Sequence, residues 1–378
     1  MILREPPRVL IATHSLTGFS GTDLYTRDLA LALLQSGWLP VVYSKIAGRI
    51  ADELRNATIP VVSELDAVTV APQMIHGHHH LETLACLSRF PNVPAVFVCH
   101  DARAWHSLPP LSPRIGAYVA VDRNCRDRMM LEHRIPEGSI RILTNAVELN
   151  RFRQRAALPL KARRALVFSN QAREDTWVAP IRHACQRRGI AVDVIGLGSG
   201  HFAEHPEDLL PGDDLIFGKA RCALEALATG AAVIVCDSAG LAGMVTTSNV
   251  DELRQLNFGA RTLTRPITNE TVEQELARYD PRDVRAVSDR IRAVASIDLL
   301  AADFIALYED VCSRQVRIAP EEEFLATAHS LDRVMAALYG EATVRRSVLS
   351  RVLRRLRDWK WLSGATRFMH RVTHGVGP

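Results

Sequence analysis

The chain alternates short apolar runs with longer segments of helical periodicity. The run at 9–12 is followed by a glycine-containing loop and by a segment over 22–36 that predicts a helix ending at Gly37. Continuous apolar runs of this kind are typical of strands in a parallel sheet that helices cover on both faces. In the first half of the chain, strands are predicted at 9–12, 40–43, 60–62, 74–76, 95–99, 117–121 and 140–143.

A second series of the same kind follows an interruption. The basic, proline-containing stretch over 151–164 breaks the alternation and predicts an interdomain linker. Strands are then predicted at 165–168, 191–195, 215–217, 232–236 and 261–263, and helices at 176–188, 219–229, 250–256, 269–278 and 281–314. We therefore expect an α/β protein with two consecutive doubly wound, Rossmann-like domains, at 1–150 and 165–300.

The pattern changes again over 317–378, where a helical tail is predicted. Pro320 and three following glutamates are typical of a helix N-terminus, and the helix is expected to reach Tyr339. Over 343–361, apolar residues at helical spacing alternate with arginines, as in a basic amphipathic helix. From 341 to 378 the chain has nine cations against two anions. We expect this helix to bind an anionic membrane surface, with packing on the protein body as the alternative.

Composition limits the other classes of protein. The length of 378 residues fits two domains, and a net charge of +4 is too small to indicate nucleic-acid binding. No apolar run is long enough for a transmembrane helix, and the N-terminus leads into a predicted strand without the features of a signal peptide. Seven cysteines without a CxxC pair indicate reduced thiols. We expect a cytoplasmic protein, peripheral on the inner face of the membrane.

Candidate site residues of the first half follow the predicted strands, where parallel sheets bind ligands. In the loop after the first strand, Gly18 and Gly21 permit close backbone approach, and Ser20, Thr22 or Asp23 can cap the next helix, although a plain turn is the alternative. His76 and His78 begin a histidine-rich segment that lacks a carboxylate or cysteine at ligand spacing, so we expect it to hold no metal and to line a cleft, with a plain surface segment as the alternative. His100 follows the strand at 95–99 and is placed to donate to a phosphate or a substrate hydroxyl, unless it only accompanies a helix-capping Asp101.

The second half supplies an anion site. Polar or glycine residues end two of its strands, namely Ser169, Asn170, Gly196 and Gly198. Lys219 and Arg221 lie near a predicted helix N-terminus, a combination suited to a diphosphate. Glu225 follows about one turn later on an otherwise apolar helix, where a buried carboxylate needs hydrogen-bonding partners. An exposed helix glutamate is the alternative.

This segment resembles the donor-sugar site of retaining GT-B glycosyltransferases of the family 4 type. The similarity is carried by Glu225-Ala-Leu-Ala-Thr-Gly230 and the strand after it, and weaker similarity extends over about 8–314. Two features depart from the family. Phe217 stands eight residues before Glu225, where the family usually has another glutamate, and the usual Arg and Lys pair is absent after the strand at 165–168.

The resemblance implies transfer of a sugar from a nucleotide-diphosphate donor to a glycan or lipid-linked acceptor, with retention of anomeric configuration, in bacterial envelope polysaccharide synthesis. It implies that the second domain binds the donor, that the first binds the acceptor, and that His100 and Glu225 are catalytic. It further implies that no metal cofactor is required and that a helix over 301–316 crosses back to the first domain. A sugar-nucleotide epimerase and an inactive donor-binding scaffold of the same fold are the alternatives.

Overall fold

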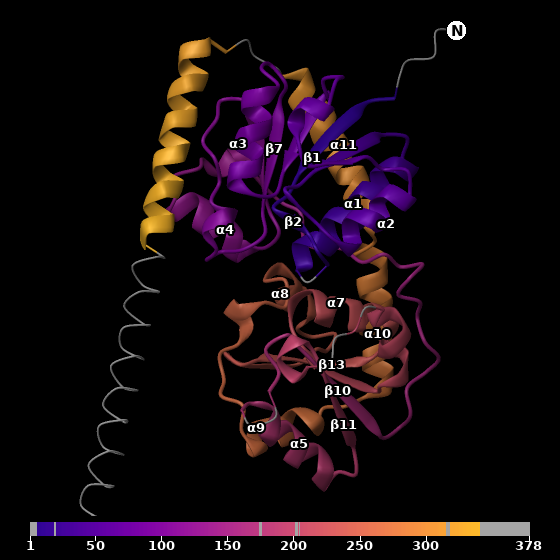
Figure 1. The fold of residues 1–378 in the computed structure, drawn as a ribbon. Helices are drawn as coiled ribbons and strands as arrows, with labels where there is room; N and C mark the ends of the chain where they lie inside the picture. Colours follow the sequence, from indigo (N-terminus) through magenta and orange to yellow (C-terminus); the bar gives the residue numbers. More distant parts are fainter. Residues whose placement is uncertain are drawn as a thin grey trace, which may run out of the picture.

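The computed structural model describes residues 6–18, 20–173, 176–200, 203, 205–314 and 318–340. It has two α/β bodies, one formed by the first half of the chain and one by the second (Figure 1). The first contains a seven-stranded parallel sheet in the order β5-β3-β1-β6-β7-β8-β9. Its strands are β1 (Arg8–Ala12), β3 (Leu39–Tyr43), β5 (Val61–Val62), β6 (Met74–Gly77), β7 (Ala95–Cys99), β8 (Ile115–Ala120) and β9 (Ile140–Ile142).

Helices cover both faces of this sheet, so its central strands are buried along their whole length, as their apolar runs predict. A small parallel pair joins β2 (Ser15–Leu16) to β4 (Ile46–Ala47) beside the sheet. The helices of this body are α1 (Gly21–Gln35), α2 (Arg49–Asn56), α3 (His80–Arg89) and α4 (Arg123–Leu131), with 3-10 turns η1 (Leu65–Ala67), η2 (Trp105–Ser107) and η3 (Glu137–Ser139).

The second body contains a five-stranded sheet in the order β11-β10-β12-β13-β14. Its strands are β10 (Arg164–Phe168), β11 (Ala191–Ile195), β12 (Leu215–Gly218), β13 (Ala232–Asp237) and β14 (Gly240–Met244), and β14 alone among them is antiparallel to its neighbour. Its helices are α5 (Val178–Arg187), α6 (Pro206–Leu209), α7 (Ala220–Thr229), α8 (Val250–Gln255), α9 (Asn269–Leu276) and α10 (Pro281–Val294), with 3-10 turns η4 (Leu197–Ser199), η5 (Leu210–Gly212) and η6 (Ala260–Thr262).

Two sequence-based predictions in this region are wrong. The segment expected as a strand at 261–263 lies in and after the 3-10 turn η6, and the edge strand is β14, which the sequence did not indicate. Gly240 and Gly243 have positive φ angles of 145° and 122°, which give β14 an irregular backbone and no apolar alternation. The helix expected over 281–314 is two helices, because Ser296 caps a new one, α11 (Ile297–Ser313).

The break between α10 and α11 is stabilised by backbone hydrogen bonds to Val147. Val147 donates its N–H to Ala295 O at 2.7 Å, and Ile297 donates its N–H to Val147 O at 3.0 Å. From this point α11 runs into the first body, where Leu300, Phe304 and Tyr308 belong to the same core as β1 and β7 (Figure 1). The core of the first body is therefore complete only when α11 has packed into it.

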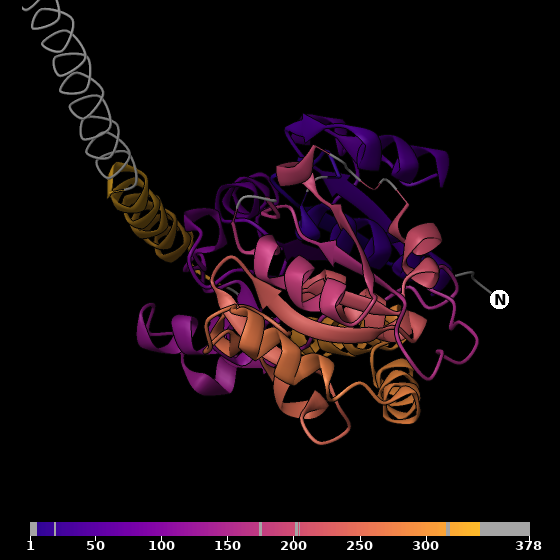
Figure 2. The same cartoon turned by 90° about the horizontal axis from the view of Figure 1, so that it is seen from below.

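A helix over 320–340 lies along the outside of the first body (Figures 1 and 2). Its inner face is fixed by an ion pair between Glu323 and Arg114 at 2.7 Å and by Ser330, whose carbonyl contacts His80 Nε2 at 3.1 Å. Its opposite face exposes large apolar side chains, including Phe324, Met335 and Tyr339. The predicted amphipathic helix over 343–361 lies outside the described residues. Among the described helices, none combines the length and apolar character needed to span a membrane.

Candidate functional site

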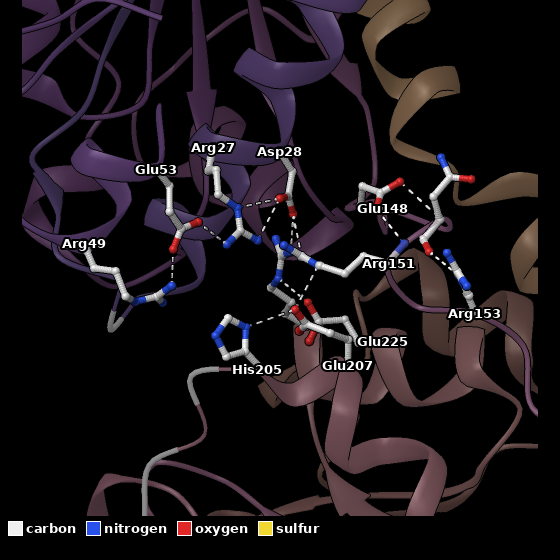
Figure 3. Close-up of polar contacts among 12 residues, drawn as sticks. Arg27, Asp28, Arg49, Glu53, Glu148, Arg151, Arg153, His205, Glu207 and Glu225 are labelled. Carbon is white, nitrogen blue, oxygen red and sulfur yellow. Dashed lines mark hydrogen bonds and ion pairs between the residues drawn. The ribbon is translucent and has the colours of Figure 1, made fainter. Parts of the chain in front are cut away.

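A cavity of about 320 Å³ lies between the two bodies, at the carboxyl ends of their strands. Its walls belong to both halves of the chain. The first contributes Gly18, Ser20, Gly21, Leu24, Arg27, Arg49 and Arg151, and the second contributes Phe168, Ser169, Asn170, Gln171, Ala203, Pro206, Glu207, Lys219, Ala220, Arg221, Cys222, Glu225 and Asp237. Figure 3 shows the charged side chains that meet across this boundary.

The second-body wall is built around the N-terminus of α7. Lys219 occupies the N-cap position with extended backbone angles, and no side chain caps the helix there. The next residue, Ala220, has a φ of 50°, a conformation that is uncommon outside glycine and that tends to occur at functional sites. A helix N-terminus with a lysine beside it and an arginine in the first turn attracts anions.

Lys219 forms an ion pair with Asp237, which ends β13 and is 1% exposed. Burial would raise the pKa of the Asp237 carboxyl, but its hydrogen bonds with Lys219 and Ser238 lower it below its ordinary value. About a third of the lysine side chain is exposed, toward the cavity that both residues line. The lysine is therefore held at the cavity wall by a buried carboxylate.

Arg221 connects the two bodies. Its Nε donates to Glu225 Oε1 at 2.6 Å along α7, and its Nη2 donates to Asp28 Oδ2 of α1. Burial alone would lower the pKa of the guanidinium, but the carboxylates of Glu225 and Asp28 raise it above its ordinary value. Arg221 therefore stays charged in a site that is largely shielded from water.

Glu225 is 3% exposed and lines the cavity, so the alternative of an exposed helix glutamate is wrong. Burial raises the pKa of its carboxyl, and the neighbouring guanidinium groups of Arg221 and Arg151 only partly offset this. Arg221 engages one of its oxygens, and no described residue donates to the other. That oxygen can accept a hydrogen bond from a hydroxyl group of a ligand.

Charged residues that the sequence did not indicate complete the wall. Arg151, within the predicted linker, lies with its guanidinium over the Phe152 ring and contacts Asp28 at 3.5 Å and Glu207 at 3.9 Å (Figure 3). Arg27 donates to Asp28 and to Glu53 at 2.9 Å each. Polar residues on the buried face of α1 were an available signal, but their partners come from distant parts of the chain.

The conformation of the loop before α1 accounts for the glycine and serine residues in it. Gly18 has a φ of 95°, and a Cβ there would lie 2.8 Å from Arg49 Nη2, so a side chain would be strained and crowded. Ser20 is the N-cap of α1 and accepts from the Asp23 N–H at 3.1 Å. Gly18, Ser20 and Gly21 line the cavity, whereas Thr22 is not among the described residues that do.

The predicted histidines gather beside the cavity without lining it. His78 Nδ1 and His100 Nε2 are 2.8 Å apart, and His76 Nδ1 contacts the Tyr308 hydroxyl of α11. The Tyr25 ring packs edge-on against His78 and His100. Burial lowers the pKa of His76 and of His100 to about 3, so both rings are neutral near pH 7. Within the described part of the chain, no group of three or more His, Cys, Asp or Glu residues is placed to hold a metal ion.

Two predicted donor residues have other positions. Gly196 packs against β10, since a Cβ there would lie 1.9 Å from Ser169 O, and it is not among the described residues lining the cavity. Gly198 lines a separate, open groove of about 1190 Å³ beside β11. The structure thus brings Ser169, Asn170, Lys219, Arg221 and Glu225 to the cavity wall. Gly196 and Gly198 contact the backbone of Ser169 and Asn170 but are not among the described residues that line the cavity.

Comparison with solved structures gives similarity at the level of the fold. A glycosyltransferase from Rickettsia africae matches with a TM-score of 0.57 and 12% identity, covering 82% of this chain and 100% of that chain. The HepE protein of Anabaena, in complex with UDP and glucose, matches with a TM-score of 0.54 and 11% identity, covering 80% of this chain and 99% of that chain. No protein-family model and no curated protein sequence matches the chain. The chain therefore has the GT-B glycosyltransferase fold, two Rossmann-like domains around a cavity, as its sequence predicted.

Proposed function

We propose that the protein is a retaining glycosyltransferase that binds a nucleotide-diphosphate sugar in the interdomain cavity and transfers the sugar to a glycan or lipid-linked acceptor. The observation that carries the proposal is the convergence of Lys219, Arg221 and Glu225 at the N-terminus of α7 in that cavity. Cations at a helix N-terminus suit a diphosphate, and a buried carboxylate suits sugar or ribose hydroxyls. HepE, with a similar fold, binds UDP and glucose.

In this proposal the protein needs no metal, because cations and the α7 dipole stabilise the departing diphosphate. Lys219 and Arg221 contact the diphosphate, and Ser169 and Asn170 approach the nucleotide from the end of β10. Glu225 accepts from a donor hydroxyl. Phe217, at the position of the family's other glutamate, is fully buried in β12. Recognition of the donor sugar therefore depends on Glu225 and on groups from the first domain.

Calorimetry with UDP, GDP, ADP and dTDP tests the donor site. We expect one of these ligands to bind, and Lys219→Met to weaken its binding by about 1.5–3 kcal/mol, the value of a hydrogen bond to a charged group. Lys45→Met is the matched control, because Lys45 pairs with Glu64 on the surface, away from the cavity. Equal affinities for Lys219→Met and the wild type would remove this segment from the donor site.

Incubation with the corresponding sugar nucleotides tests the reaction. Slow donor hydrolysis supports a transferase, and transfer to an added glycan with the anomeric configuration kept in the NMR spectrum supports a retaining one. Interconversion of the donor sugar would indicate an epimerase, and binding without turnover would indicate a scaffold. Inversion at the anomeric carbon would contradict the retaining mechanism.

We also propose peripheral attachment to an anionic membrane surface, which would bring the enzyme to a lipid-linked acceptor on the cytoplasmic side. The outer face of the 320–340 helix exposes Phe324 by 75% and Tyr339 by 71%, and the chain continues into the basic segment over 343–361. Apolar side chains and cations together favour such an interface.

Co-sedimentation with vesicles containing phosphatidylserine tests this attachment. We expect the full chain to bind more strongly than a 1–340 truncation and Phe324→Ser to weaken binding. Leu131→Ser is the control, because Leu131 is similarly exposed, by 79%, on another helix. Equal binding by the full chain and the truncation would reject the proposal.

A further inference from the structure

Asp28 on α1 is the point where three arginines from different parts of the chain meet. Arg27, its neighbour, donates from Nε to Oδ1 at 2.9 Å. Arg221 of the second domain and Arg151, which follows the first domain, both contact Oδ2. Figure 3 shows Arg27 and Arg151 converging on Asp28 beside Glu225.

The burial of Asp28 makes this arrangement unusual. The residue is 3% exposed, within α1. Burial alone would raise the pKa of the Asp28 carboxyl, but the guanidinium groups of Arg221, Arg27 and Arg151 lower it below its ordinary value. Buried ion pairs of this kind are often no more stabilising than apolar residues of similar volume. Stability therefore gives little reason for a carboxylate at this position.

The contacts of Arg221 and Arg151 leave some of their N–H groups for another partner. Arg221 uses Nε for Glu225 and Nη2 for Asp28, and no described residue accepts from its Nη1. Arg151 is held more loosely, with side-chain contacts of 3.5 Å to Asp28 and 3.9 Å to Glu207. Both arginines line the cavity, whereas Asp28 is not among the described residues that do. Asp28 thus holds these two cavity cations from behind, as it holds Arg27, which also lines the cavity.

We propose that Asp28 is a positioning residue that presents Arg151 and Arg221 together to the diphosphate of the ligand in the cavity. This inference rests on the proposed function. Preorganised donors are effective because their orientation costs nothing when the anion arrives. The sequence analysis assigned Arg221 to the diphosphate together with Lys219, but gave no role to Arg151 or Asp28.

The position of Asp28 also links binding to the placement of the domains. The carboxylate belongs to the first domain and Arg221 to the second, so the cation pair is complete only when α1 and α7 are in contact. A diphosphate that binds the pair therefore stabilises this placement, and the placement strengthens binding by the same factor.

Calorimetry with UDP, UMP and inorganic pyrophosphate on the full chain tests the inference. We expect Asp28→Asn to weaken UDP and pyrophosphate by about tenfold, within the range of couplings between sites, and to change UMP much less. Asp28→Glu should recover part of the loss. Asp214→Asn is the matched control, because Asp214 is also a buried aspartate that contacts an arginine, Arg155, and neither residue lines the cavity.

A double-mutant cycle separates positioning from a general loss of structure. If Asp28 acts through Arg221, Asp28→Asn should have much less effect on pyrophosphate affinity in an Arg221→Gln background than in the wild type. Thermal unfolding of each variant establishes that it is folded at the assay temperature. If Asp28→Asn does not fold, the comparison of Asp28→Glu with Asp214→Glu decides instead, since only the former should weaken pyrophosphate.

The outcomes distinguish this inference from the proposed function. A wild-type protein that binds pyrophosphate and a nucleoside diphosphate, with Asp28→Asn equal to it, would overturn the positioning role alone. Tighter binding by Asp28→Asn would overturn it too, and would show that Asp28 competes with the ligand for the arginines. A wild-type protein that binds none of these anions would reject both.

Discussion

Replacement of Gly116 by alanine should destabilise the contact between β8 and the crossing helix α11. A Cβ at this position would lie 2.6 Å from Val311 Cγ1 and 3.1 Å from Val311 Cγ2. Val311 is 3% exposed and belongs to the core of the first domain. A valine in a helix strongly prefers one rotamer, so rotation of its side chain offers little relief. The strand and the helix must move apart instead.

The size of the effect follows from these contacts. Overpacking of a core by one methyl group typically costs about 1–3 kcal/mol. For a domain of this size, about 2 kcal/mol corresponds to a fall in Tm of roughly 4–8 °C. Val311→Ala alone should cost at least about 1.6 kcal/mol for two buried methyl groups. In the double variant the new methyl group partly fills the space left by Val311, so its cost should be smaller than the sum of the two.

Thermal and urea unfolding of both single variants and the double variant measure this coupling. Gly138→Ala is the control, since a Cβ there meets no atom within 4 Å. We expect the coupling energy between Gly116→Ala and Val311→Ala to reach about 1 kcal/mol, as for residues in contact. A Tm for Gly116→Ala equal to that of Gly138→Ala, or strictly additive effects, would show that α11 does not pack against β8 as described.

Three further predictions concern the site and its histidines. Glu225→Gln should weaken the binding of a sugar nucleotide by about tenfold, because a charged acceptor for its hydroxyl groups is removed. The binding of pyrophosphate should be unchanged or tighter, because a negative charge is removed as well. Equal losses of affinity for both ligands in calorimetry would contradict this. The pKa values of His76 and His100 are about 3 in the folded protein and near 6.5 in the unfolded chain. The free energy of unfolding should therefore be full above pH 6.5 and fall as the pH decreases, by about 1 kcal/mol per histidine between pH 6.5 and 5.5. A flat urea-unfolding profile over that range would refute the neutral rings. His100→Ala should lower kcat without a large change in donor affinity if the ring reaches the acceptor, and wild-type turnover would assign the role elsewhere.

The two-domain α/β fold was predictable because its strands appear in the sequence as uninterrupted apolar runs. The runs at 95–99 and 232–236 became the fully buried strands β7 and β13. The edge strand β14 was not predictable, because Gly240 and Gly243 give it no apolar pattern. Its position is set by pairing with β13 and by a bridge between Leu241 and Arg265. Such contacts depend on the folded arrangement.

The cluster around α7 was also predictable, as was the glycine loop with Gly18, Ser20 and Gly21, but the charged partners from outside the second domain were not. Lys219, Arg221 and Glu225 lie within seven residues of one another, so local spacing was enough to group them. Asp28 and Arg151 are separated from Arg221 by 193 and 70 positions. Neither belongs to a local motif, and only the packing of α1 against the second domain brings them together. The same holds for Asp237 as the partner of Lys219.

The route of α11 has a consequence for protein synthesis. Leu300, Phe304 and Tyr308 are part of the first domain's core, yet they leave the ribosome only after the whole second domain has been translated. Until then the nascent first domain lacks one of its packing surfaces, and apolar residues such as Trp38 and Phe97 have fewer neighbours than in the finished protein. N-terminal domains generally fold first during synthesis. Here that order is interrupted, so the first-domain half of the cavity can take its final form only after α11 has been made, whereas the cores of the second domain contain no residue of α11.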